Sequence, residues 1–183
     1  MSHGPSSAEQ RLLVAEALPC EWEPGDQTAS EALSVQAESN LRVLQAAELF
    51  DERSRPAASD NAAENAELAR IHAKLDVLML LVCQALSRQR PAASPLLLMH
   101  DGFVAPQRVA GLPEVGQRAW CRLWLHSGLP LPWRWPMACV ADRPDGAELH
   151  FLELPDALQA AWDRHVFRRH RRELALRHRS SES

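Results

Sequence analysis

Hydrophobic residues recur every three or four positions along two segments in the first half of the chain. Residues 30–53 contain neither Gly nor Pro, and their apolar side chains fall along one side of a helix. These side chains are Leu33, Ala37, Leu44 and Ala47. The pattern predicts a helix from Ser30 to Arg53 that is ended by Pro56. A second helix is predicted to begin at the N-cap residues 59–61 and to end near Arg90.

The second helix carries an apolar stripe with the seven-residue repeat of a coiled coil, uninterrupted over residues 61–89. The core positions a and d, which we predict to form the oligomer contact, are Leu68, Ile71, Leu75, Leu78, Val82 and Ala85. Leu predominates at a, and Ile71 is the β-branched residue at d, a combination that disfavours dimers. Apolar residues at flanking positions, Met79, Leu81 and Leu86, widen the stripe. We therefore expect a homo-oligomer, in first place a parallel tetramer, with the trimer left open.

Two other environments would also accept such a helix. It could pack on its own domain or on the helix of residues 30–53. Its length, about 45 Å for roughly 30 residues, exceeds the width of a small barrel, which favours self-association. We do not expect a membrane span, because the longest uninterrupted apolar run, residues 77–83, is far shorter than the roughly 20 residues that a bilayer requires.

The second half of the chain predicts a small β domain, because short apolar segments alternate there with Gly and Pro. The predicted strands cover residues 96–100, 103–106, 118–126, 133–141 and 147–152. A further strand is predicted near the N-terminus, within residues 10–22. A last helix is predicted to begin at Pro155 and Asp156. Its apolar side consists of Leu158, Ala161, Trp162 and His165.

Tryptophan and arginine side chains predict a surface on the β domain. In the strand of residues 118–126, the odd positions are apolar and suit a core, so the even positions take the opposite face. Together with the neighbouring strand, that face offers Trp120, Arg122, Trp124, Trp133 and Trp135. Trp and Arg on one face are typical of a surface that binds another protein. The alternative is that these tryptophans lie beneath the last helix, against Trp162.

Charge is distributed unevenly along a chain whose net charge is −4. Residues 1–90 carry −6, whereas residues 164–179 carry +6. The basic C-terminal tail offers nucleic-acid binding as an alternative function. We favour a solvated helix end, because no aromatic residues interleave with the arginines for base stacking.

The residues that could carry catalysis or bind a metal are not spaced for either task. The β region holds two cysteines and three histidines, but no C-x-x-C or H-x-x-x-H spacing joins them. Neither G-x-S-x-G nor a glycine-rich phosphate loop occurs. We expect no enzymatic activity, no metal and no cofactor. The N-terminal residues MSHGPSSAEQ lack the features of a secretory signal, so we expect a cytoplasmic protein with reduced cysteines.

Four segments of residues 95–175 follow one another in a characteristic order. They are Asp101-Gly-Phe103, Leu112-Pro-Glu-Val-Gly116, Gly146-Ala-Glu-Leu-His-Phe-Leu-Glu-Leu154 and Phe167-Arg-Arg-His-Arg-Arg-Glu173. This order resembles that of the PilZ domain family. The resemblance implies an α+β fold: a six-stranded antiparallel β-barrel with a C-terminal helix. Residues 95–154 supply five strands, so residues 1–25 would supply the sixth. Residues 30–90 would then be a helical insertion that interrupts the barrel, and residues 176–183 a disordered tail.

The resemblance also implies a role in bacterial cyclic-di-GMP signalling, but the family's nucleotide motifs are absent. Nucleotide-binding members carry an RxxxR motif before the barrel and a DxSxxG motif at a following strand. With Gly102 as the motif glycine, Leu97 and Met99 stand where Asp and Ser belong, and Arg88 and Arg90 have the wrong spacing. We therefore predict a non-catalytic adaptor that self-assembles and contacts an unidentified signalling protein, with weak or absent cyclic-di-GMP binding. A direct receptor with a non-standard site is the alternative.

Overall fold

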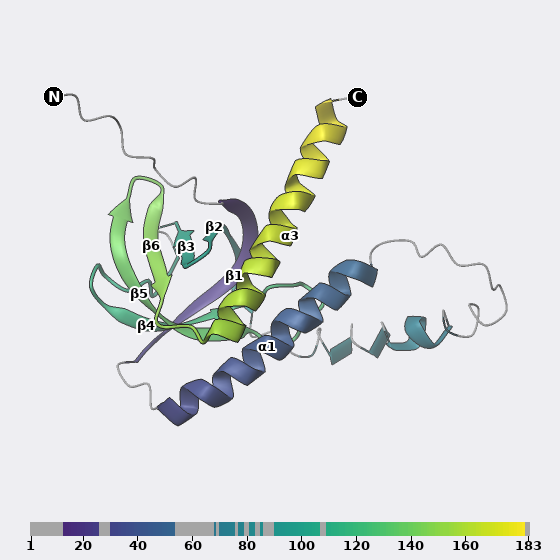
Figure 1. Ribbon diagram of the computed structural model, residues 1–183, viewed down its shortest axis with the longest axis horizontal. Coiled ribbons are helices and arrows are strands. Elements are labelled where there is room, and N and C mark those ends of the chain that lie inside the picture. Colours follow the sequence, from purple (N-terminus) through teal and green to yellow (C-terminus); the bar gives the residue numbers. More distant parts are fainter. Residues whose placement is uncertain are drawn as a thin grey trace.

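The computed structural model describes residues 13–25, 30–53, 90–106 and 109–181, together with 68, 70–75, 77, 78, 81, 82 and 85. Six antiparallel strands form a closed barrel in the order β1-β2-β3-β6-β5-β4 (Figure 1). The strands are β1 (Val14–Pro24), β2 (Ala93–Met99), β3 (Gly102–Ala105), β4 (Arg118–Leu123), β5 (Trp133–Arg143) and β6 (Gly146–Phe151). The predicted six-stranded barrel is confirmed.

The strand β1 closes the barrel. Its first half, Val14 to Pro19, pairs with β2, and its second half, Cys20 to Pro24, pairs with β4. The polypeptide leaves the barrel after β1 and returns at β2, so the helical segments are an insertion between two paired strands. Gly102 permits close contact between β3 and β6, because a Cβ atom there would lie 1.9 Å from the carbonyl oxygen of Leu149.

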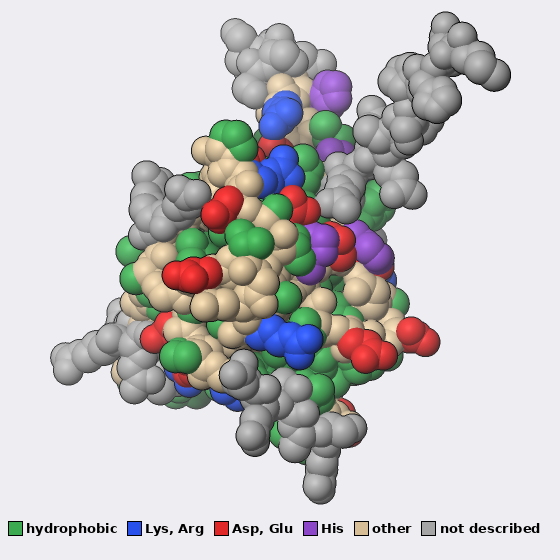
Figure 2. Space-filling model, turned by 90° about the vertical axis from the view of Figure 1, so that its left-hand side faces the viewer, with side chains coloured by type: hydrophobic (Ala, Val, Ile, Leu, Met, Phe, Trp, Pro, Cys, Tyr) green, Lys and Arg blue, Asp and Glu red, His purple; other side chains and the backbone are tan. Residues whose placement is uncertain are grey.

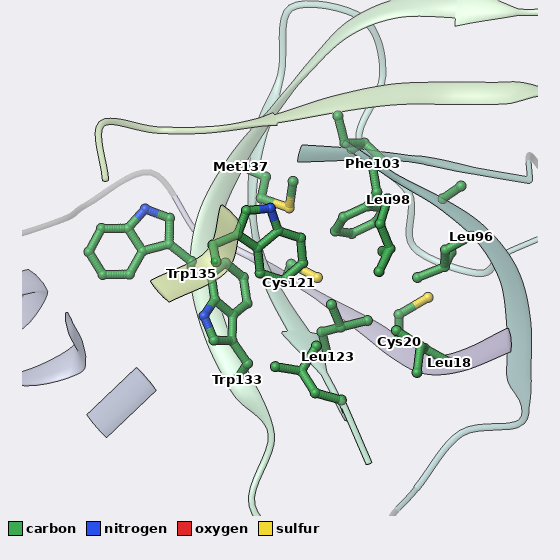
Figure 3. Close-up of a cluster of buried hydrophobic side chains, with 14 of the residues drawn as sticks. Leu18, Cys20, Leu96, Leu98, Phe103, Cys121, Leu123, Trp133, Trp135 and Met137 are labelled. Carbon is green, nitrogen blue, oxygen red and sulfur yellow. The ribbon is translucent and has the colours of Figure 1, made fainter. Parts of the chain in front are cut away.

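The core lies inside the barrel, and the register of β4 and β5 decides which tryptophans enter it. Cys121 pairs with Trp135, and Leu123 pairs with Trp133, so these four side chains share one face of the sheet. All four are at most 1% exposed, and Figure 3 shows them in the core. The alternation predicted for residues 118–126 is confirmed for the odd positions, which are all buried.

Helix α3 (Asp156–Ser181) covers the barrel with the predicted apolar side. Leu158, Ala161, Trp162 and His165 are all buried. The indole of Trp162 donates a hydrogen bond to the carbonyl of Met99 at 2.8 Å and packs on Trp133, with ring centroids 5.5 Å apart. The prediction of a disordered tail from residue 176 is wrong as far as Ser181. The helix continues there through Leu176 and Arg177, residue types that favour helix, and an ion pair joins Arg177 to Glu173.

Helix α1 (Ser30–Arg53) has the predicted bounds and packs against β5 and α3. Ala37, Leu44 and Ala47 are buried, and Leu33 packs on the core. Between α1 and β2, every described residue from 68 to 85 is helical. Among the described helices, none combines the length and hydropathy needed to cross a bilayer.

Candidate self-association and partner-binding surfaces

The six residues predicted to form the oligomer contact are all among the described residues and are all helical. The helix predicted for residues 61–89, which the structure describes at 68, 70–75, 77, 78, 81, 82 and 85, is here called the assembly helix. All six are exposed in the single chain, and the exposed fraction of Leu68, Ile71, Leu75, Leu78 and Val82 ranges from 43% to 58%. Their spacing of three and four residues puts them on one side of the helix. The flanking Met79 and Leu86 lie outside the described residues. A stripe of this length in water favours association, because burying each Leu or Ile contributes about 1.5–3 kcal/mol.

Helix α1, which precedes the assembly helix, is fixed to the barrel by a buried amide. Asn40 is 0% exposed; it donates a hydrogen bond to the carbonyl of Arg134 at 2.8 Å and accepts one from its N–H at 3.0 Å. On the β6 side of β5, strand pairing begins only at Met137, so among the described strands Arg134 has no partner on that side. The Asn40 amide takes the place of that partner. Gln36 donates to the Asn40 side-chain oxygen at 3.1 Å and orients the amide.

Arginines of the basic run in α3 pair with carboxylates of α1 and β1. The guanidinium of Arg169, whose side chain is 12% exposed, lies 3.1 Å from Glu16 and 3.3 Å from Asp51. Arg172 lies 2.9 Å from Asp51, and Arg168 lies 3.6 Å from Glu48. Burial raises the pKa of Glu16, and the Asp51 charge adds to the rise while Arg169 opposes it.

These pairings weaken the nucleic-acid alternative, because part of the positive charge is already neutralised within the chain. On the face shown in Figure 2, basic and acidic side chains of the described residues lie interspersed, without a continuous basic stripe. A groove that follows a phosphate backbone needs such a stripe.

The expected tryptophan surface divides into two groups. Trp133 and Trp135 lie in the core, where the strand register places them, so they do not belong to an exposed surface. Trp133 lies against Trp162 of α3, as expected if the tryptophans lie beneath the last helix. The prediction of one exposed surface that includes both residues is therefore wrong.

The other three residues of the expected surface, Trp120, Arg122 and Trp124, lie outside the core cluster, and the two tryptophans have little free surface. Trp120 and Trp124 are 9% and 5% exposed. The guanidinium of Arg134 lies 4.2 Å from the centre of the Trp120 ring. Arg122 pairs with Glu23 at 2.6 Å and with Glu21 at 3.5 Å, so this face of the barrel satisfies its own charges.

The positions that align with the nucleotide motifs are used for packing. Leu97 pairs with Val104 in the sheet, and Met99 is 1% exposed. Arg90 donates hydrogen bonds to the carbonyls of Ser127, at 2.9 Å, and Leu129. Arg88 lies outside the described residues.

Two surface hollows were considered as nucleotide sites. One, of about 460 Å³, has two carboxylates in its lining, from Glu114 and Asp142, and these would repel phosphate. The other, of about 730 Å³, has Arg118 as the one cation in its described lining. Neither offers the paired arginines that grip a dinucleotide in the family pattern.

The cysteines and histidines of the described residues do not assemble into a reactive centre. Burial raises the pKa of Cys20 to about 11 and raises that of Cys121 well above its ordinary value, so both thiols stay protonated. Burial also lowers the pKa of His165 to about 3. Among the described residues, no group of three or more His, Cys, Asp or Glu side chains has the geometry to hold a metal ion.

Sequence reasoning missed Asn40 and the ion pairs of Arg169, which fix the helical insertion to the barrel. No local signal could have found them, because the hydrogen bonds of Asn40 span 94 residues and depend on the docked position of α1.

Comparisons with known proteins point to one family. A family model described as "Atypical PilZ domain, cyclic di-GMP receptor" matches residues 41–179. No curated protein matches the chain. Among solved structures, the chain is similar to a protein of Xanthomonas campestris described as a new tetrameric PilZ domain self-assembled via an unusual helical bundle. The two are 25% identical with a TM-score of 0.65, and the match covers 91% of this chain and 92% of that chain.

Proposed function

The chain belongs to the atypical PilZ domain family, and we propose that it is a non-catalytic adaptor of cyclic-di-GMP signalling that assembles through its assembly helix. The observation that carries this proposal is the exposed apolar stripe from Leu68 to Ala85. The core cluster of the barrel contains none of these side chains, and their regular helical spacing suits a contact between chains.

The proposed assembly is a parallel tetramer. The heptad residues favour more than two strands, and the similar Xanthomonas protein is described as a tetramer built through a helical bundle. In a parallel bundle each chain repeats the same contact around one axis. The barrels would then be displayed together, which multiplies any weak contact that each makes with a signalling partner.

The mass of the assembly tests this proposal. Light scattering on the full chain is expected to give four times the 20.5 kDa of one chain. A mass of three chains would favour the trimer. A mass of one chain at micromolar concentration would contradict self-assembly and leave the exposed stripe for a different partner.

Direct cyclic-di-GMP binding is proposed to be weak or absent, because Leu97, Met99 and Arg90 hold structural positions in place of the nucleotide motifs. We expect calorimetry at neutral pH to detect no dissociation constant below about 10 µM, equivalent to about −7 kcal/mol.

The second candidate is a direct receptor with a non-standard site, which the description of the family model as a cyclic-di-GMP receptor favours. The same calorimetry separates the two candidates. A submicromolar dissociation constant would establish the receptor and overturn the adaptor proposal. Titration with GMP in place of the cyclic dinucleotide controls for general anion binding.

A further inference from the structure

The C-terminal part of α1 and the residue that leads into β2 meet the barrel at one loop. Helix α1 leaves toward the assembly helix after Phe50, and the chain returns to β2 through Arg90. Between β4 and β5 the loop of residues 126–129 contacts both. We call Phe50, Arg90 and this loop the neck.

His126 holds the C-terminal part of α1. Its ring stacks on Phe50 of α1, with centroids 5.3 Å apart and planes inclined by 29°. Its Nδ1 atom accepts a hydrogen bond from the N–H of Gly128 at 2.9 Å, so this nitrogen carries no proton. A Cβ atom at Gly128 would lie 3.1 Å from that Nδ1 and 3.4 Å from Phe50, which shows how closely the loop is packed here.

Arg90 holds the returning end against the same loop. Its guanidinium donates to the carbonyls of Ser127 and Leu129, and Leu129 is 6% exposed. The N–H of Leu129 in turn donates to the carbonyl of His126 at 3.1 Å. A change in the orientation of His126 therefore reaches both Phe50 of α1 and Arg90 through one short loop.

Charged groups from every element around the neck act on the His126 ring. They are Asp51 of α1, Arg169, Arg172 and His165 of α3, and Arg90, while Glu16 of β1 pairs with Arg169. Burial is the largest cause that lowers the pKa of His126, and the three arginines lower it further, whereas Asp51 opposes them. The neck thus favours the neutral ring.

We propose that His126 is an acid-sensitive latch, whose neutral ring fixes the C-terminal part of α1 and Arg90 to the barrel and whose protonation releases the neck. Protonation removes the acceptor for the Gly128 N–H and places a cation among Arg90, Arg169 and Arg172. The proposal rests on the proposed function, because it names a regulation of the same assembly helix.

The direction of the pH effect follows from the lowered pKa. The pKa of His126 is lowered in the closed neck from its ordinary value of 6.5. The neutral ring therefore stabilises the closed neck fully at pH values above 6.5. The stabilisation is lost as the pH falls below 6.5, because the open state then binds the proton more readily. For each pH unit below 6.5, the equilibrium constant for closing the neck falls by up to about tenfold, until the pH reaches the lowered pKa of His126.

Amide hydrogen exchange of the full chain at pH 7.5 and pH 5.5, corrected for the intrinsic pH dependence of exchange, tests the latch. We expect the Gly128 amide and residues 44–51 to lose up to about tenfold of their protection at pH 5.5. The strand amides of Leu96 to Leu98 should keep theirs. The midpoint of the change should coincide with the titration of the His126 ring followed by NMR.

A matched pair of variants supplies the control. His126→Asn retains an acceptor for the N–H two residues later, as in an Asx turn, but cannot be protonated, so its neck should show no pH dependence. His100→Asn, which changes a histidine paired with Asp163 outside the neck, should behave as wild type.

The latch is overturned by a wild-type neck that exchanges equally at both pH values, or by an equal pH response in His126→Asn. A loss of protection that includes Leu96 to Leu98 would also overturn it, because the response would then be global unfolding. Light scattering on the same samples reports assembly separately. A single-chain mass contradicts the proposed function, whereas the exchange result decides the latch.

Discussion

The two helical segments of the insertion are both amphipathic, but the apolar side of one is buried and that of the other is exposed. Helix α1 turns its apolar side to the barrel, where Ala37, Leu44 and Ala47 are buried. The described residues of the assembly helix are all exposed, Ile71 and Leu78 among them. The same helical periodicity therefore leads to an intramolecular contact in one case and to an unpaired stripe in the other.

The two apolar sides differ in composition. The docked side of α1 contains two alanines and Asn40 beside Val43 and Leu44, and the Asn40 amide bonds the backbone of Arg134 in β5. The stripe of the assembly helix consists mainly of Leu, Ile and Val, whose volume suits the interlocking of side chains between parallel helices.

The largest expected effect comes from placing a charge in the stripe. Ile71→Lys is predicted to reduce the assembly to single chains, because each copy would bring one ammonium group to the bundle axis, and each costs several kcal/mol to desolvate. Lysine is a good helix former, so the helix itself should persist. Light scattering measures the change in mass.

Ala73→Lys is the matched control for this variant. Ala73 is exposed and lies two residues away, at the outward-facing f position of the heptad. It should keep the wild-type mass. If both variants stay assembled, or if both dissociate, the stripe is not the contact between chains.

The same Leu→Ala truncation in each helix distinguishes a helix that packs on the barrel from one that does not. In the Ile71→Lys background, where assembly is removed, Leu44→Ala is expected to lower the free energy of unfolding by about 2–5 kcal/mol, because it leaves a cavity between α1 and the barrel. Leu78→Ala in the same background should change it by less than about 0.5 kcal/mol, because Leu78 is 58% exposed. Urea titration followed by tryptophan fluorescence gives both values. Equal losses would mean that the assembly helix docks on its own barrel.

The fold could be predicted to the level of individual elements, because its signals are local. Alternation in residues 118–126 and the uninterrupted pattern of residues 30–53 gave the correct strand and helix, and the family resemblance led to the barrel that is confirmed. The surfaces were harder to predict. Whether Trp133 faces inward depends on its pairing with Leu123, and the partners of Arg169 come from distant parts of the chain. Strand register and long-range ion pairs cannot be recognised from the spacing of residue types in the sequence. The coiled coil stays a prediction.

The buried amide of α1 gives a smaller expected effect. Asn40→Ala is predicted to cost about 1–3 kcal/mol of unfolding free energy, because the N–H and C=O of Arg134 lose their partner beneath the helix. Gln36→Ala removes only the bond that orients the amide and should cost less. Urea titration in the Ile71→Lys background measures both. A larger loss for Gln36→Ala would show that Asn40 is not the residue that fixes α1.

The smallest expected effect concerns the outer face of the barrel, where charges pair within the chain. Glu23 lies 2.6 Å from Arg122 and 3.0 Å from Arg134, but all three side chains are about one-third exposed. Water and salt therefore screen the pairs, and Glu23→Gln should cost less than about 1 kcal/mol, with the loss shrinking further at 0.5 M salt. Glu38→Gln, in a largely exposed pair with Arg42, should cost still less. The mass should not change in either variant, because the proposed assembly contact lies on the assembly helix and not on the barrel face. If Glu23→Gln dissociated, the outer face of the barrel would belong to the contact between chains. The comparison between a barrel whose charges pair within the chain and a helix that associates with other chains would then fail.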